Sequence, residues 1–236
     1  MIWSKLDYDA AFEAERRIEY PAIAEFESRA GFAIERELLE RAGCTLACPV
    51  KRNPPNWQHG RVIYAAARQY LQGRSGPHNF LDIGTAKGFS ALCMALAAAD
   101  VGSRETSVTS LDVIDPTQRV ARNSVADLTG LKTVREYLSA WPEADSILFL
   151  QSTGIDWLMS NESRIHFAFV DGKHTHDAVS REAALLASRQ HAGDVVVFDD
   201  LQIEGVAQAV ANLRGVYDIE YVQAKQDRRY AVGVRR

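Results

Sequence analysis

Short apolar segments that suit β-strands alternate with helix-like segments from residue 80 to the end of the chain. Strands are expected at residues 80–83, 107–113, 147–151, 165–170 and 194–198, and helices notably at 177–190 and 203–213. This alternation is typical of a parallel sheet that is covered by helices on both faces. Two alternating apolar segments, 217–222 and 230–234, end the chain and predict a hairpin. A doubly wound α/β sheet is therefore the expected fold.

A turn that contains two glycines connects the first expected strand to the helical run 91–99. The strand ends in Asp82, and Gly84 and Gly88 follow, four residues apart. Glycine is needed where backbone turns sharply and passes close to a ligand, and the first N–H groups of the next helix point back at the turn. A dinucleotide fingerprint requires a third glycine and a phosphate loop requires a Gly-Lys-Ser/Thr ending, so neither fits. The turn predicts a site for a nucleotide-like ligand.

The segment Asp82–Ser90 resembles motif I of the class I S-adenosylmethionine (SAM) methyltransferases, in the form D-I-G-T-x-x-G-x-S found among small-molecule O-methyltransferases. The resemblance extends over about two-thirds of the chain. It implies a Rossmann-like, doubly wound sheet of seven strands whose last strand runs antiparallel. It also implies that SAM is bound by Asp82, Gly84, Thr85, Gly88 and Ser90.

Further cofactor-binding residues are expected after the second and third strands, because ligands of doubly wound sheets lie beyond the carboxyl ends of the strands. In the methyltransferase family a carboxylate after the second strand binds the ribose hydroxyls of SAM. By this match Asp112 is the candidate, with Asp115 as its rival, and a turn aspartate is the structural alternative. Similarly, Ser152 or Thr153 would contact the adenine, unless these residues only form a helix N-cap.

Two later segments, Phe169–His174 and Val196–Asp200, resemble those that follow strands four and five in catechol-type and macrocin-type O-methyltransferases. In catechol-type enzymes, aspartates at these places hold a divalent metal. The match implies that Asp171, Asp199 and Asp200 bind Mg²⁺, whose preferred donors are hard oxygens, and that Asp171 also lies beside SAM. Such a metal would lower the pKa of the acceptor hydroxyl and orient it toward the methyl group. The structural alternative is that all three aspartates cap turns or helices.

The same segment offers a general base. Catechol-type enzymes carry a lysine three residues after the first metal aspartate, and this chain has His174 at that offset, directly after Lys173. Histidine titrates near neutrality, whereas lysine needs burial or a neighbouring cation to lower its pKa. His176 is a further alternative. A metal-independent reaction, in which His174 or Asp171 alone activates the acceptor, is the rival mechanism.

Residues 1–78 are interpreted as an N-terminal helical cap on a SAM-binding domain formed by residues 79–236. Composition predicts helix over residues 10–29, and amphipathic spacing predicts another over 59–71, whereas the prolines within 48–56 cannot continue a helix. Gly43 is a plausible end for the first helical region. Trp57 and His59 are candidates for the wall of the acceptor pocket, with ordinary packing as the alternative.

Two other patterns in this region carry less weight. Residues 53–56 are similar to the N-P-P-Y loop of adenine methyltransferases, but that loop belongs after strand four and ends in an aromatic residue. Cys44, Cys48 and His59 have the types of metal ligands, but a fourth ligand at suitable spacing is missing.

Composition is compatible with a single enzyme domain and argues against a nucleic-acid-binding or membrane protein. The 236 residues are 47% hydrophobic, enough for one substantial core, and the net charge is −4. The sequence has no basic block for nucleic acid, no membrane-spanning apolar run and no signal peptide, which predicts a cytoplasmic protein. The predicted function is methylation, by SAM, of a hydroxyl on a small molecule, with Mg²⁺ assistance. A non-catalytic SAM-fold protein is the alternative, and a homodimer is left open.

Overall fold

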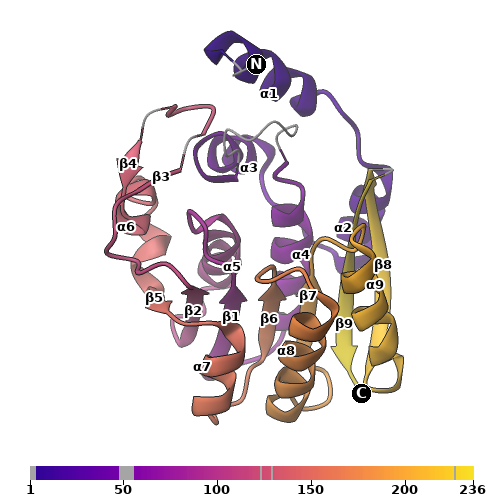
Figure 1. Ribbon diagram of the computed structural model, residues 1–236. Coiled ribbons are helices and arrows are strands. Elements are labelled where there is room, and N and C mark those ends of the chain that lie inside the picture. The colour runs from indigo at the N-terminus through magenta and orange to yellow at the C-terminus, as the bar shows by residue number, and fades with distance from the viewer. Residues whose placement is uncertain (1–3, 48–55, 123, 129, 226) are drawn as a thin grey trace.

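The structure is a computed structural model, which describes residues 4–47, 56–122, 124–128, 130–225 and 227–236. Its centre is a seven-stranded sheet (Figure 1). The strands are β1 (His78–Ile83), β2 (Thr106–Asp112), β5 (Ile147–Gln151), β6 (Phe167–Val170), β7 (Val195–Phe198), β8 (Tyr217–Lys225) and β9 (Arg228–Arg235). They lie in the order β5-β2-β1-β6-β7-β9-β8, in which β9 pairs antiparallel with both β7 and β8 and the other neighbouring strands pair parallel. The predicted seven-stranded α/β sheet with an antiparallel last strand is confirmed.

The strand order reverses direction at β1. From β1 the chain proceeds to β2 on one side and later returns to β6 on the other. The carboxyl ends of the parallel strands point to the same edge of the sheet, toward α1 (Lys5–Arg16) and α3 (Arg36–Ala42) in Figure 1. The order of the strands therefore reverses at β1, and doubly wound sheets bind their ligands beside such a reversal.

Both faces of the sheet are covered by helices, which explains the continuous apolar sequences of its central strands. Every residue of β6 and of β7 is buried. On one face lie α2 (Pro21–Ala30), α4 (His59–Leu71) and α5 (Phe89–Asp100), and on the other lie α7 (Gly154–Ser160), α8 (His176–Arg189) and α9 (Glu204–Ala211). The helices expected at 59–71, 91–99, 177–190 and 203–213 are thus present within a few residues of their predicted ends.

The N-terminal helices share one apolar cluster with a face of the sheet. Tyr8 of α1 (Lys5–Arg16), Ile23 of α2 and Leu39 of α3 (Arg36–Ala42) all belong to the cluster that contains Phe80 of β1. Helices α1 and α3 lie above the carboxyl edge of the sheet (Figure 1). Described residues of both parts thus share this cluster, and the division into a cap of residues 1–78 and a domain of residues 79–236 stays a prediction.

The helix predicted over residues 10–29 is in fact two helices. α1 ends at Arg16 and α2 begins at Pro21, since proline lacks the N–H that a continuous helix needs but fits the first turn of a new one. At Gly43 the α-helix stops as expected, but a π-helical turn, Gly43–Ala47, follows it. A Cβ on Gly43 would lie 2.7 Å from Cγ of Trp57, so this glycine lets the chain pass the buried indole.

The segment between β2 and β5 contains small elements that the sequence did not predict. They are β3 (Val120–Ala121), β4 (Leu131–Lys132), α6 (Val134–Tyr137) and a 3₁₀ turn, Pro142–Ser146; another 3₁₀ turn, Asn212–Gly215, precedes β8. β3 and β4 pair antiparallel to each other, outside the main sheet. Among the described residues, no helix has the length and apolar character needed to cross a membrane.

Candidate active site

The turn between β1 and α5 has the strained backbone that its glycines predict. Gly84 has φ +107° and Gly88 has φ +85°, both in the region that favours glycine. The backbone N–H groups of Gly84 and Thr85 donate to the carbonyl oxygen of Leu111, at 2.9 and 3.0 Å. A Cβ on Gly84 would lie 2.3 Å from the carbonyl oxygen of Asp171. This close approach brings the glycine turn against the loop that follows β6.

Asp82 lies beneath the turn, where it has no exposed surface. Ser110 donates a hydrogen bond to its carboxylate, and the Ser110 hydroxyl is also 2.7 Å from that of Thr85. Burial raises the pKa of Asp82 to about 7, and hydrogen bonds from Ser110 and Ser90 oppose this rise. The polar residues of the motif thus form an internal network that supports the turn. Direct contact between Asp82 and a cofactor stays a prediction.

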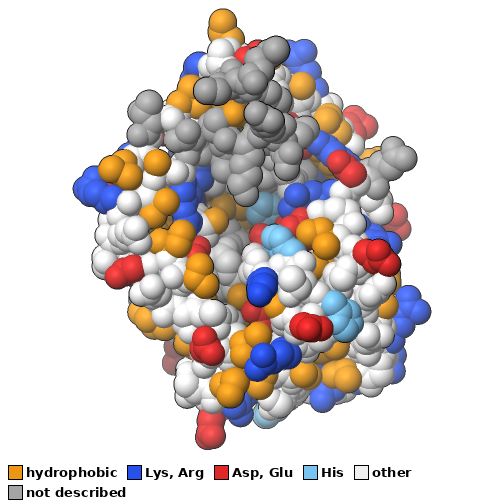
Figure 2. All heavy atoms as spheres, viewed as in Figure 1, with side chains coloured by type: hydrophobic (Ala, Val, Ile, Leu, Met, Phe, Trp, Pro, Cys, Tyr) orange, Lys and Arg blue, Asp and Glu red, His pale blue; other side chains and the backbone are white. Residues whose placement is uncertain are grey.

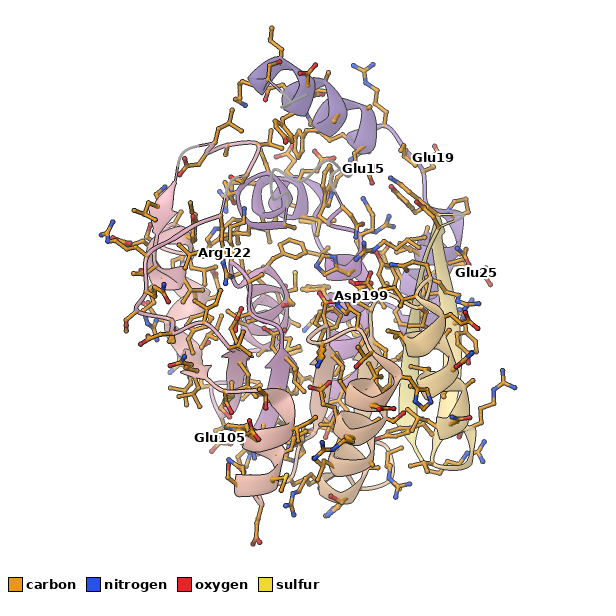
Figure 3. All side chains as sticks on the ribbon, viewed as in Figure 1. Glu15, Glu19, Glu25, Glu105, Arg122 and Asp199 are labelled. Carbon is orange, nitrogen blue, oxygen red and sulfur yellow. The ribbon has the colours of Figure 1, made fainter. Side chains whose placement is uncertain are left out.

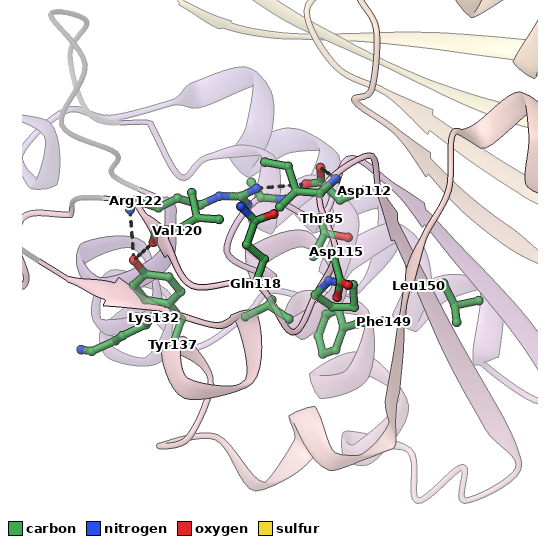
Figure 4. A pocket seen from close by; sticks show the side chains of 14 residues that line it. Thr85, Asp112, Asp115, Gln118, Val120, Arg122, Lys132, Tyr137, Phe149 and Leu150 are labelled. Carbon is green, nitrogen blue, oxygen red and sulfur yellow. Dashed lines mark hydrogen bonds and ion pairs between the residues drawn. The ribbon is translucent and has the colours of Figure 1, made fainter.

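A cleft lies beside the carboxyl ends of β2 and β5 (Figure 4). Its described lining consists of Thr85, Ala86, Asp112, Ile114, Asp115, Pro116, Gln118, Val120, Arg122, Lys132, Val134, Tyr137, Phe149 and Leu150. The cleft therefore joins the glycine turn to the residues after β2, as expected for a site that takes a nucleoside.

Asp112 is the acidic residue that contacts the glycine turn. Its Oδ2 accepts a hydrogen bond from the N–H of Ala86 at 3.0 Å, and its Oδ1 accepts one from Ile114 at 3.0 Å. Arg122 Nη2 lies 3.4 Å from Oδ2. Asp115, the rival, lies on the same cleft but is engaged in a local turn with the backbone and hydroxyl of Thr117. Asp112 is thus bonded to the glycine turn and Asp115 to its own loop, and the choice of ribose ligand between them stays a prediction.

Ser152 and Thr153 occupy the start of α7. The Ser152 N–H donates to the carbonyl oxygen of Asp112 at 2.9 Å, and Thr153 is the N-cap, accepting from the N–H of Asp156 at 3.0 Å. The described lining of the cleft includes Phe149 and Leu150 of β5 in place of these two residues. Adenine contact by Ser152 or Thr153 stays a prediction, and their observed contacts match the structural alternative.

A second group of polar residues lies at the ends of β6 and β7. His174 Nε2 is 3.0 Å from Oδ1 of Asp171 and 3.2 Å from Oδ2 of Asp200. Histidine and acidic side chains gather in the centre of this face (Figure 2), and Asp199 lies above the β6–β7 side of the sheet while Arg122 lies above the β2–β5 side (Figure 3). The two groups thus lie on opposite sides of β1.

Asp171 and His174 shift each other's pKa. Burial raises the pKa of Asp171 to about 7, the charge of Asp199 raises it further, and the hydrogen bond to His174 opposes both effects. The hydrogen bond to Asp171 raises the pKa of His174 above its ordinary value. An imidazole that is oriented by carboxylates can accept a proton and keep the resulting charge stabilised.

The other candidate bases have different contacts. Lys173 is exposed, and its carbonyl oxygen accepts the N–H of Thr175 at 2.9 Å. His176 begins α8, and its Nδ1 lies 3.3 Å from Asp177. Of the predicted bases, His174 and Asp171 are the two that the structure brings together.

Asp199 faces an arginine that the sequence pattern did not indicate. Its Oδ2 is 2.8 Å from Nη2 of Arg228, and its Oδ1 accepts the N–H of Asp200 at 2.6 Å. The side chain of Asp199 has no exposed surface. Among the described residues, the donor atoms that lie within 4.8 Å of one another belong instead to Asp171, His174 and Asp200. Asp199 does not belong to that grouping, and metal binding by Asp171, Asp199 and Asp200 stays a prediction.

Comparison with known proteins decides the family. Residues 81–201, just over half of the chain, match a family described as a methyltransferase domain. The chain belongs to this methyltransferase family. The match spans the glycine turn, the cleft and the strand ends that carry Asp171 and Asp200, and it makes the chain a SAM-dependent methyltransferase.

Solved structures of other methyltransferases share the fold. An O-methyltransferase from Bacillus cereus in complex with SAH has 13% identity and a TM-score of 0.56, with 93% of each chain covered. The O-methyltransferase TomG from Streptomyces achromogenes, in complex with SAM, has 16% identity and a TM-score of 0.59, covering 86% of this chain and 91% of its own. The SAH-bound methyltransferase PaMTH1 from Podospora anserina has 14% identity and a TM-score of 0.59, with coverages of 91% and 94%. No curated protein matches the sequence.

Lys87 and Tyr137 of this methyltransferase connect the site to parts of the chain that sequence patterns treat separately. Lys87, within the glycine turn, is buried and donates to the carbonyl oxygen of Thr45 at 3.0 Å, which joins the turn to the N-terminal helices. The Tyr137 hydroxyl accepts the N–H of Arg122 at 3.1 Å. The capping box Thr133–Glu136 is the sequence signal for α6, which carries Tyr137.

His59 also belongs to the surroundings of the site. Its ring stacks on Phe169 at a centroid distance of 5.9 Å and meets the edge of Phe89 at 4.9 Å. Burial lowers its pKa to about 3, so the imidazole is neutral. A metal site with Cys44 is not among the groupings of described ligand atoms, and Cys48, like residues 53–55 of the proline loop, lies outside the described residues.

Proposed function

We propose that this methyltransferase transfers a methyl group from SAM to a hydroxyl of a small molecule. The observation that carries the proposal is the contact between the two halves of the site. Gly84, in the turn that would hold SAM, packs against the carbonyl of Asp171, whose carboxylate is 3.0 Å from His174. A proton acceptor thus lies next to the turn, as transfer to a hydroxyl requires.

His174 and its carboxylates would perform the proton transfer. The acceptor oxygen forms a bond to the methyl carbon while the carbon–sulfur bond breaks, and the electron pair of that bond neutralises the sulfonium. The hydroxyl proton passes to His174, whose imidazolium is stabilised by Asp171 and Asp200 at 3.0 and 3.2 Å. SAM supplies the methyl group, and Gly84, Thr85 and Asp112 would hold it.

The charges around the site favour a small acceptor over a nucleic acid. Asp171, Asp199 and Asp200 surround the proposed reaction centre, and carboxylates repel phosphate backbones, which need lysine and arginine contacts. The net charge of −4 points in the same direction. A cytoplasmic location and a homodimer are predictions of the sequence that no contact in the structure addresses.

Metal assistance is the second candidate for activation of the acceptor. Asp171, His174 and Asp200 offer three donor atoms within 4.8 Å, a mixed oxygen and nitrogen set that suits a divalent transition ion better than Mg²⁺. A bound ion would supply Lewis acidity and lower the pKa of the acceptor hydroxyl. His174 would then be a ligand, so the two mechanisms assign it different roles.

Calorimetry with SAM and a paired substitution test the proposal. The full chain should bind SAM, and it should form S-adenosylhomocysteine with a member of a panel of phenols, catechols and sugar alcohols. His174→Ala should lower kcat by about 10² to 10⁴ without changing SAM affinity, because general-base catalysis is worth that much. His176→Ala is the matched control and should retain activity. Absence of SAM binding would contradict the function, and equal activity of the two variants would exclude His174 as the base.

A further inference from the structure

Arg228 occupies a fixed position beside the two aspartates that follow β7. It is the first residue of β9, which pairs antiparallel with β7, so its side chain reaches past the end of β7. Its Nη2 lies 2.8 Å from Oδ2 of Asp199 and 3.4 Å from Oδ1 of Asp200. The guanidinium lies 6.0 Å from the ring centroid of Tyr230, which is fully buried. One cation therefore bridges both carboxylates.

The bridging leaves Asp199 without a free oxygen. One carboxylate oxygen accepts the N–H of Asp200 and the other faces Arg228, and the side chain has no exposed surface. Asp200 uses Oδ1 for Arg228 and Gln202, and its Oδ2 faces His174. A magnesium ion would have to displace these partners, because its ligands must lie at about 2.0–2.1 Å in octahedral geometry.

The charge of Arg228 also opposes a second cation. Arginine cannot be deprotonated in proteins, so the guanidinium is positive at every working pH. Burial lowers the pKa of Arg228 and the charge of Asp199 raises it, and the pKa lies above its ordinary value. A dication held by Asp200 would stand within a few ångströms of this charge, in surroundings that screen it poorly.

We propose that Arg228 is the resident cation of this site and holds Asp199 and Asp200 in the place of a divalent ion. Asp199 is then a structural partner of Arg228, and the carboxylate pair is neutralised in part by the chain itself. The consequence for catalysis, that methyl transfer needs no divalent metal, rests on the proposed function. The expectation that Asp199 and Asp200 bind divalent ions weakly does not rest on the proposed function, since it concerns the carboxylates alone.

Titration of the full chain with Mn²⁺, followed by electron paramagnetic resonance, tests the proposal directly. Wild type should bind Mn²⁺ no more tightly than millimolar, and its SAM affinity should be the same with and without EDTA. Arg228→Met removes the cation while keeping an apolar stem, and it should strengthen Mn²⁺ binding by at least about tenfold. Arg229→Met is the matched control on the same strand, because Arg229 contacts the carbonyl of Leu201 and the ring of Tyr221 instead.

The outcomes separate this proposal from the proposed function. Micromolar Mn²⁺ binding by wild type would overturn it, as would an Arg228→Met variant that binds Mn²⁺ no better than Arg229→Met. If Arg228→Met does not fold, Arg228→Lys keeps the charge and should bind Mn²⁺ as weakly as wild type, and the wild-type titration still decides. Loss of SAM binding would contradict the methyltransferase function while leaving the Mn²⁺ result intact.

Discussion

Gly84 has two separate reasons to be glycine, and they allow a sharp prediction. Its φ is +107°, and a Cβ would lie 2.3 Å from the carbonyl oxygen of Asp171. Gly84→Ala must therefore push the glycine turn away from the loop after β6, which displaces the surface that would hold SAM. We expect at least a tenfold loss of SAM affinity, or about 1.4 kcal/mol, measured by calorimetry.

Gly102→Ala is the control for the backbone effect alone. Gly102 has φ +67°, and no atom lies within 4 Å of the position that a Cβ would take there. The substitution therefore costs about 1–2 kcal/mol of folding free energy and touches no neighbour. Its SAM affinity should equal that of wild type. If both variants bind SAM equally well, the ligand lies elsewhere.

The loop after β2 is the element that distinguishes the two candidate ribose ligands. Asp112 is bonded to the glycine turn through Ala86, whereas Asp115 is engaged with Thr117 in a local turn. Asp112→Ala should weaken SAM binding by about tenfold or more, because it removes both a hydroxyl ligand and a support of the turn. Asp115→Ala should change the affinity less than about threefold in the same calorimetric titration. The reverse order of losses would assign the ribose to Asp115.

Some helices, strands and contacts of this protein have a signal in the sequence, and others do not. The buried strands β6 and β7 are continuous apolar runs, and the glycine turn has a local motif, so the sequence predicts both. Pro21 divides a helix that composition makes continuous. Arg228 could not be found, because its contact with Asp199 depends on the pairing of β9 with β7 and spans 29 residues of sequence. A site residue that is brought into place by the pairing of distant strands leaves no local signal in the sequence.

Across the whole molecule, three acids with raised pKa values and a histidine with a lowered pKa affect the pH dependence of stability in opposite directions. Burial raises the pKa of Asp82, Asp171 and Glu182 to about 7, whereas burial lowers that of His59 to about 3. The acids contribute stability at low pH that is lost as pH rises, and the neutral histidine contributes stability that is lost as pH falls below its ordinary pKa. The free energy of unfolding of wild type therefore varies with pH as a sum of opposing effects. The contribution of one group is obtained by comparing wild type with a variant that lacks that group.

Glu182 is the one of these three acids that has no assigned part in SAM binding or proton transfer, although the charge of His174 opposes the effect of burial on its pKa. It lies on α8 beneath the loops after β5 and β6, where a Cβ on Gly154 would come 2.6 Å from its Oε1. Its folded pKa of about 7 exceeds the ordinary value of 4.5, so its stabilising contribution is full below 4.5 and is lost as pH rises through about 7. Glutamine stays neutral throughout. Glu182→Gln should thus gain free energy of unfolding relative to wild type between about pH 5 and pH 8, measured by urea denaturation. The control Glu162→Gln, at an exposed residue, should show no such gain. If the free energy of unfolding of Glu182→Gln differs from that of wild type by the same amount at both pH values, the Glu182 carboxyl is already ionised in the folded protein.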